Sequence, residues 1–245
     1  MEIGGLQKFS LLDYPGKIAA IVFTQGCNFR CHYCYNPVLV WPKRRGKVKY
    51  PSPKGEGQEG HPRIKEGDLF DFLKKRKGKL DGVVVTGGEP TIQPDLPEFL
   101  AKIKKLGYLI KLDTNGSNPK MLSRIFKEKL ADYIAMDLKA APEEYEKACG
   151  IKFGLDKIKK SIKIIRESGV AREFRTTAVP GLVDKSDIEA LGKLIKGEEN
   201  WFLQGFKKET ELVNERFRGE KAYNMKEMEG LRKIALKYVK NCGIR

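Results

Sequence analysis

The chain has 245 residues, which is enough to bury one sizeable hydrophobic core. Its 48 Lys and Arg residues outnumber its 32 Asp and Glu residues and give a formal net charge of +16. Such a surface attracts nucleic acid or an acidic protein, but it is also typical of a heat-adapted protein. The composition argues against a disulfide framework, a membrane span and a secretory signal, so we expect a cytoplasmic protein.

Short β-rich segments alternate with amphipathic helical patterns along the chain. We expect strands at Ile18–Thr24, Gly82–Thr86, Leu109–Asp113, Tyr133–Asp137, Glu173–Ala178 and Trp201–Gln204. We expect helices at 66–76, 95–106, 119–128, 155–168, 185–196 and 224–240. This alternation is typical of parallel βαβ units, and about six units are too few for a closed eight-stranded barrel. The sequence therefore predicts an α/β fold, either an open partial barrel or a doubly wound sheet, with its ligand at the C-terminal ends of the strands.

One stretch breaks this rhythm. From Trp41 to Glu66 the chain is rich in Gly, Pro and charged residues and has no periodic apolar face. We expect a flexible insertion at about 41–66 within a single domain that spans 1–245. A loop that docks a partner is the alternative.

Three of the five cysteines, Cys27, Cys31 and Cys34, follow directly on the first expected strand. Thiolates bind zinc or iron–sulfur clusters, and a closed zinc site would want a fourth Cys or His at a familiar spacing. The nearest candidate, His32, lies between two of the cysteines, so a zinc site is disfavoured. Three cysteines on a cluster of four irons would leave one iron open to a substrate. Cys149 and Cys242 stand apart, and we expect them to be semi-buried small apolar residues.

The pattern Cys-x-x-x-Cys-x-aromatic-Cys at Cys27, Cys31 and Cys34 resembles the signature of the radical S-adenosylmethionine enzymes. This resemblance implies a partial (β/α)6 barrel with a [4Fe–4S] cluster on these three cysteines. It also implies that S-adenosylmethionine binds the open iron and is cleaved reductively to a 5′-deoxyadenosyl radical, which abstracts hydrogen from a substrate.

The ends of the later expected strands carry further resemblances. The segment Thr86-Gly87-Gly88-Glu89-Pro90 resembles the GGEP motif, which holds the methionyl amino group. The segments Asp113-Thr114 and Met136-Asp137-Leu138-Lys139 resemble the pyruvate formate-lyase activating enzyme. The resemblance implies cofactor contacts from Gly87, Gly88, Glu89, Asp113, Asp137, Lys139 and Arg175. It also implies a monovalent cation held by Asp113, Thr114, Met136 and Asp137.

The segments Ser10–Gly16 and Phe23–Cys27 resemble the glycyl-radical activases, most closely the anaerobic ribonucleoside-triphosphate reductase activating proteins. This resemblance implies a glycyl-radical enzyme as protein substrate and an electron donor such as flavodoxin or ferredoxin. The chain departs from the activases at Tyr35, where they often have His. It also lacks the histidine-bearing segment of the pyruvate formate-lyase activase at its sixth expected strand. No second set of cysteines is present, so one cluster is expected.

Two alternatives remain open at this point. A radical enzyme that modifies RNA or a nucleotide would explain the basic charge, but no recognisable RNA-binding module accompanies it, so nucleic acid is not favoured as a partner. A non-catalytic iron–sulfur or zinc module would leave the polar ends of the expected strands unexplained.

Overall fold

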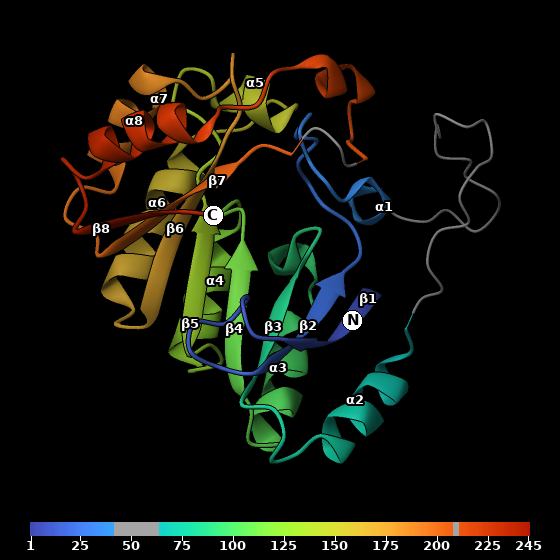
Figure 1. Cartoon of the computed structure of the whole chain (residues 1–245). Helices are drawn as coiled ribbons and strands as arrows, with labels where there is room; N and C mark the ends of the chain where they lie inside the picture. Colours follow the sequence, from blue (N-terminus) through green and yellow to red (C-terminus); the bar gives the residue numbers. More distant parts are fainter. Residues whose placement is uncertain (42–63, 208–210) are drawn as a thin grey trace.

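A computed structural model describes residues 1–41, 64–207 and 211–245 of the chain (Figure 1). Its strands are β1 (Ile3–Ser10), β2 (Ala19–Thr24), β3 (Gly82–Gly87), β4 (Leu109–Thr114), β5 (Tyr133–Asp137), β6 (Ala171–Ala178), β7 (Asn200–Gly205) and β8 (Asn241–Ile244). Its α-helices are α1 (Pro37–Val40), α2 (Glu66–Lys75), α3 (Leu96–Lys105), α4 (Pro119–Lys127), α5 (Tyr145–Cys149), α6 (Asp156–Glu167), α7 (Lys185–Leu194) and α8 (Met225–Ala235). Two short 3-10 helices, η1 (Pro90–Ile92) and η2 (Glu215–Gly219), complete the set.

The eight strands form one sheet whose spatial order, β1 to β8, follows the chain. Neighbouring strands from β2 to β8 are parallel, whereas β1 is antiparallel to β2. Because β1 and β8 are the two edges of this order, the sheet is open. Figure 1 shows α3, α4 and α6 packed behind the sheet, so its other face is left for a site. The fold is the expected partial barrel and not a doubly wound sheet.

The alternation of side chains along the strands explains the two faces. The larger core joins residues such as Val83, Ile110 and Ile134 to the apolar sides of the helices. A smaller cluster on the inner face holds Tyr14, Ala19, Ile21 and Val84. Successive residues of a strand point to opposite faces, so Lys111 and Asp113 share the inner face with these residues.

The six expected strands are all present, and the sheet has two more that were not expected, one at each edge. Strand β1 (IGGLQKFS) contains two glycines and exposed polar residues, and β8 (NCGI) has only four residues. An edge strand has a neighbouring strand on one side only. It therefore needs fewer buried apolar residues than a central strand, and its sequence shows little alternation of apolar and polar residues. The helix expected at 224–240 ends at Ala235, and the chain then turns into β8.

The expected insertion at about 41–66 lies mostly outside the described residues, which omit 42–63. On its two sides, Trp41 lies beneath the guanidinium of Arg30 at 4.2 Å, and Ile64 forms a β-bridge with Ile3. Glu66 already begins α2. None of the described helices combines the length and the apolar character needed to span a bilayer.

Candidate functional site

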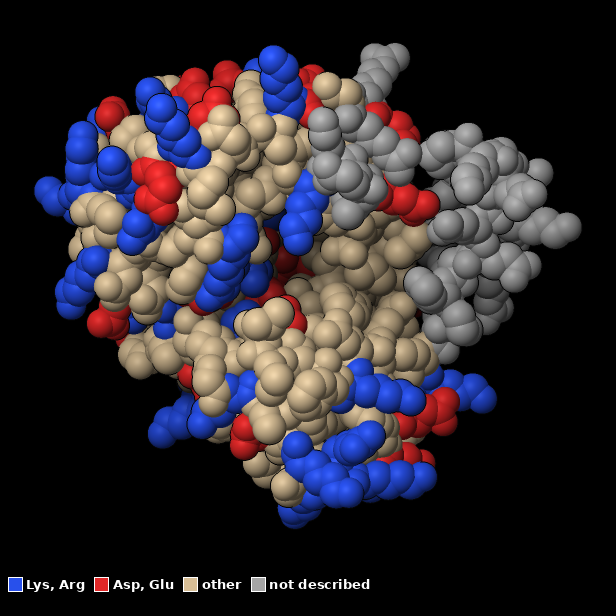
Figure 2. Space-filling view, viewed as in Figure 1, with Lys and Arg blue, Asp and Glu red and all other residues tan. Residues whose placement is uncertain are grey.

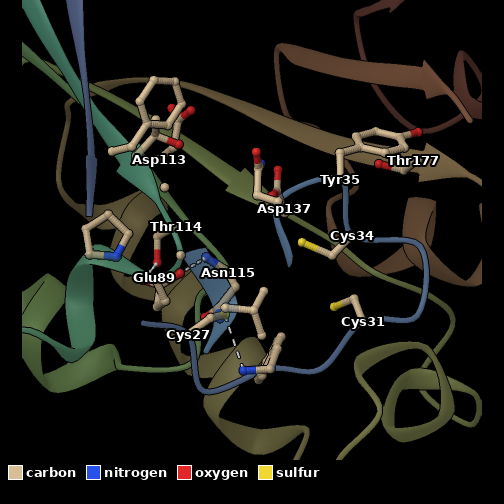
Figure 3. Close-up of a pocket in the computed structure, with 18 of the residues that line it drawn as sticks. Cys27, Cys31, Cys34, Tyr35, Glu89, Asp113, Thr114, Asn115, Asp137 and Thr177 are labelled. Atoms are coloured by element: carbon tan, nitrogen blue, oxygen red, sulfur yellow. Dashed lines mark hydrogen bonds between the residues drawn. The ribbon is translucent and has the colours of Figure 1, made fainter. Parts of the chain in front are cut away.

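A cavity of about 330 Å³ opens at the C-terminal ends of the parallel strands (Figure 3). Its lining includes the predicted residues Cys27, Cys31, Cys34, Gly87, Gly88, Glu89, Asp113, Thr114, Asp137, Lys139 and Arg175. Figure 2 shows it as a hollow with acidic atoms in its depth and basic side chains along one side. Parallel strands end at one edge of the sheet, which is why residues so far apart in the sequence meet here.

The three cysteines lie on the loop that follows β2. Hydrogen bonds fix the backbone of this loop, from Cys34 N to the Cys31 oxygen at 3.1 Å and from Arg30 Nη1 to the Cys27 oxygen at 2.6 Å. Figure 3 shows the sulfur atoms of Cys31 and Cys34 directed toward the interior of the pocket. Among the residues with described positions, no three Cys, His, Asp or Glu side chains are grouped closely enough to hold one metal ion. Three soft sulfur donors on one cavity nonetheless match the ligand chemistry of an iron–sulfur cluster.

The thiols differ in their surroundings. Burial raises the pKa of Cys27 to about 12 and also raises the pKa of Cys34. The pKa of Cys31 is lowered instead, chiefly by its interaction with the neighbouring thiol of Cys149. Since metal ligands must be thiolates, binding of a cluster would release protons from this loop.

The segment after β7 covers the cysteine loop. The amide of Val213 donates to the carbonyl oxygen of Cys34 at 3.1 Å, and the amide of Asn214 donates to that of His32 at 3.0 Å. The ring of His32 stacks on Phe217 with 5.4 Å between ring centroids. The hydroxyl of Tyr35 accepts a hydrogen bond from Lys207 N at 2.8 Å. Tyr35, the position at which the activases often have His, therefore connects the cysteine loop to the segment that follows β7.

The carboxylate of Glu89 is buried, with 1% of the residue exposed, and it connects the ends of β3 and β4. It accepts hydrogen bonds from Thr91, from Thr114 Oγ1 at 2.7 Å and from Asn115 N at 2.6 Å (Figure 3). Burial raises its pKa despite these bonds. Glu89 thus shapes the turn at the cavity from within, and its direct contact with a methionyl amine stays a prediction.

Five charged side chains form a chain of ion pairs on the inner face of the sheet. Arg175 lies between the two aspartates, with Nη1 3.0 Å from Asp113 Oδ2 and Nε 2.8 Å from Asp137 Oδ1. Lys139 pairs with Asp137 at 3.0 Å, and Lys111 pairs with Asp113 at 2.6 Å. Burial alone would raise the pKa of both aspartates, but Arg175 and the lysines hold each of them below its usual value. The aspartates are therefore ionised, and the predicted residues Asp113, Asp137, Lys139 and Arg175 form one unit.

The remaining predicted residues separate into two groups. Gly87 ends β3 and Gly88 begins the turn after it, and a Cβ on Gly88 would lie 1.9 Å from the oxygen of Gly26. Met136 is not among the residues that line the cavity. Its side chain belongs to the core on the helix side, where it packs against Gly116. A ligand role for Met136 would therefore have to come from its backbone.

Sequence reasoning missed two residues at this site. Lys111 is 2% exposed and pairs with Asp113, although in the sequence it reads as a polar position of an alternating strand. Cys149 was expected to be an isolated, semi-buried apolar residue. It is fully buried, and its thiol lowers the pKa of Cys31. Its carbonyl oxygen also accepts from Arg30 N at 2.7 Å, so the end of α5 is fixed to the cysteine loop.

Comparison with known proteins identifies the family of this chain. The family model of the Radical SAM superfamily matches residues 21–195. A Methanocaldococcus jannaschii protein with the provisional name of glycyl-radical enzyme activating enzyme is 33% identical over 250 residues, which cover 99% of this chain and 95% of that protein. The pyruvate formate-lyase-activating enzyme of Clostridium pasteurianum is 30% identical over 207 residues, covering 81% of this chain and 78% of that enzyme.

The crystal structure of QueE from Escherichia coli shares the fold with a TM-score of 0.55. The match covers 100% of this chain and 93% of that one at 16% identity, so it speaks for the fold alone. The family model and the two sequence relatives together carry the assignment. The chain belongs to the radical SAM superfamily and, within it, to the family of the glycyl-radical activating enzymes.

Proposed function

We propose that this protein cleaves S-adenosylmethionine reductively and generates a glycyl radical on a partner enzyme. The observation that carries the proposal is the convergence of Cys27, Cys31 and Cys34 with the chain of ion pairs in one cavity. Radical chemistry requires the cluster, the methionyl group and the target hydrogen to be adjacent. The family of the chain implies the first two of these, a [4Fe–4S] cluster and S-adenosylmethionine.

In this proposal the three cysteines hold the cluster, which supplies the electron for cleavage when it is bound and reduced. Gly87 and Gly88 let the backbone approach the methionyl amine, since glycine presents no side chain there. Arg175 and Lys139 are the cations next to the cavity that suit a carboxylate. Asp113 and Asp137 hold those cations in place.

The target of the radical follows from the relatives. One relative is named as an activating enzyme of glycyl-radical enzymes, and the other as the activating enzyme of pyruvate formate-lyase. For this chain we infer a partner of the anaerobic ribonucleotide reductase type, because Ser10–Gly16 and Phe23–Cys27 resemble that group of activases. A flavodoxin or ferredoxin would be the electron donor, and the reaction would take place in the cytoplasm within a single domain spanning 1–245.

The cofactor is tested first. Anaerobic reconstitution is expected to give about four irons per chain, and Cys27→Ala, Cys31→Ala or Cys34→Ala should each abolish the catalytic form of the cluster. Cys242→Ala is the matched control, because Cys242 is buried on β8 beside Arg232 and outside the cavity lining. Stoichiometric zinc without iron uptake would refute the cluster.

The partner is tested by electron paramagnetic resonance. The reconstituted protein is reduced, mixed anaerobically with S-adenosylmethionine and an anaerobic ribonucleotide reductase, and frozen. A glycyl doublet on the reductase supports the proposal. The contrary result is that RNA or a nucleotide stimulates release of 5′-deoxyadenosine while no glycyl-radical enzyme acquires a doublet. The protein would then be a modification enzyme whose basic surface binds the nucleic acid or nucleotide.

A further inference from the structure

Lys111 is a fully buried lysine directly beneath the proposed cofactor site. The residue is 2% exposed and lies on β4, two positions before Asp113, so both side chains project from the same face of the strand. Its Nζ is 2.6 Å from Asp113 Oδ1 and lies 6.0 Å from the ring centroid of Tyr133. A buried ammonium group is costly unless it has a charged partner, so this lysine has a definite task.

The predicted cation ligands are already occupied by side chains of the protein. Lys111 and Arg175 each take one oxygen of Asp113, at 2.6 and 3.0 Å. Arg175 and Lys139 each take one oxygen of Asp137, at 2.8 and 3.0 Å. Thr114 Oγ1 donates to Glu89 and accepts from Gly116 N, and the Met136 side chain lies in the core on the helix side. These groups do not fit the expected monovalent cation.

Counting charges shows what Lys111 replaces. Three cations (Lys111, Arg175 and Lys139) and two anions (Asp113 and Asp137) leave a net charge of +1 on the chain of ion pairs. Without Lys111 the sum would be zero, and one bound monovalent cation would restore it. A surplus of one positive charge on this chain of ion pairs complements the methionyl carboxylate of S-adenosylmethionine, whose ammonium and sulfonium groups need other partners.

We propose that the ammonium group of Lys111 is the built-in monovalent cation of this site, so that S-adenosylmethionine binds without Na⁺ or K⁺. This inference rests on the proposed function, which assigns the cavity to S-adenosylmethionine. Lys111 acts through Asp113 and Arg175, so it is a positioning residue.

The test measures the affinity for S-adenosylmethionine by anaerobic calorimetry on the reconstituted protein. Choline chloride, sodium chloride and potassium chloride are compared at constant ionic strength. The wild-type dissociation constant should be the same in all three salts. Lys111→Ala removes the charge and leaves room, so its affinity should fall about tenfold in choline chloride, as for one lost charge-assisted contact, and recover in Na⁺ or K⁺.

Three further variants sharpen the result. Lys111→Met fills the space without a charge and should stay weak in every salt, whereas Lys111→Arg should bind independently of the cation. Lys104→Ala is the matched control. Lys104 lies on α3, outside the cavity lining, and its ammonium group pairs with Asp132 at 2.7 Å. Thermal unfolding without cofactor provides a second readout. Na⁺ or K⁺, compared with choline, should raise the melting temperature of Lys111→Ala and leave that of the wild type unchanged.

Two results would overturn the inference and leave the proposed function standing. One is wild-type binding that requires Na⁺ or K⁺, which can be measured even if Lys111→Ala does not fold. The other is a Lys111→Ala protein with wild-type affinity in choline chloride. Failure of the wild type to bind S-adenosylmethionine in any salt would instead refute the proposed function, and this inference with it.

Discussion

The three sulfur atoms of the site have different surroundings. Burial raises the pKa of the Cys27 and Cys34 thiols, whereas the neighbouring thiol of Cys149 lowers the pKa of Cys31. Cys149 is held in place because its carbonyl oxygen binds the amide of Arg30 and the adjacent Gly150 packs against the oxygen of Arg30. A donor next to a ligand sulfur withdraws electron density from it and so favours the reduced state of a cluster.

Cys149→Ala should therefore lower the reduction potential of the cluster by about 20–60 mV, the one-electron equivalent of one modest hydrogen bond. Redox titration followed by electron paramagnetic resonance measures the midpoint. Cys242→Ala serves as control, since this cysteine is also buried but lies beside Arg232 on β8. An unchanged midpoint in Cys149→Ala would mean that the neighbouring thiol has no electronic influence.

At the scale of elements, the turns after β2 and β3 approach each other so closely that only glycine fits. Gly88 N donates to Thr24 O at 2.9 Å, and Glu89 N donates to Gly26 O at 2.8 Å. A Cβ on Gly88 would lie 1.9 Å from the oxygen of Gly26, a backbone atom that cannot move aside on its own. The cysteine loop and the Gly87–Gly88 turn are consequently placed by one set of contacts.

Gly88→Ala should separate the two turns, destabilise the protein by about 1–3 kcal/mol and weaken both iron uptake and S-adenosylmethionine binding. Gly230→Ala is the matched control. Gly230 lies within α8 with nothing near the position of an added Cβ, so alanine should stabilise the protein by about 0.5–1 kcal/mol. Chemical denaturation measures both variants. Equal stability of the two would disprove the close approach.

At the scale of the whole molecule, ion pairs inside the barrel join strands from its middle to its edge. Asp113, Asp137 and Arg175 connect β4, β5 and β6, and Arg245 near β8 pairs with Glu173 of β6 at 3.0 Å. Burial would raise the pKa of Asp137, but Arg175 and Lys139 hold it well below the usual range. The sheet therefore depends on an ionised carboxylate in its interior.

This dependence predicts how stability changes in acid. The folded pKa of Asp137 lies below its unfolded value of about 3.9, so its contribution is fully present above that pH and is lost as the pH falls further. The Asp137→Asn side chain does not titrate in this range. Below about pH 4, the free energy of unfolding of this variant should therefore depend less steeply on pH than that of the wild type, by up to about 1.4 kcal/mol per pH unit. Denaturation at a series of pH values tests this, and identical slopes would contradict it.

The sequence was sufficient for six of the seven parallel strands, β2 to β7, because short β-rich segments alternate there with amphipathic helices. It also located the cysteines and the polar ends of β3 to β6, since the residues at the C-terminal ends of parallel strands converge. Lys111 and Cys149 could not be assigned in this way. Their contacts with Asp113 and Cys31 depend on which face of β4 is turned inward and on where α5 ends against the cysteine loop. β1 and β8 were missed because short edge strands carry little apolar pattern.

The order of the sheet has a consequence for synthesis. Since β1 to β8 are added in the order in which the ribosome produces them, each strand finds its neighbour already made. The cysteine loop emerges early, whereas Val213 and Asn214, whose amides cover Cys34 and His32, emerge among the last residues. The order of the chain therefore allows β1 to β7 to pair before the segment that covers the cysteine loop has been made.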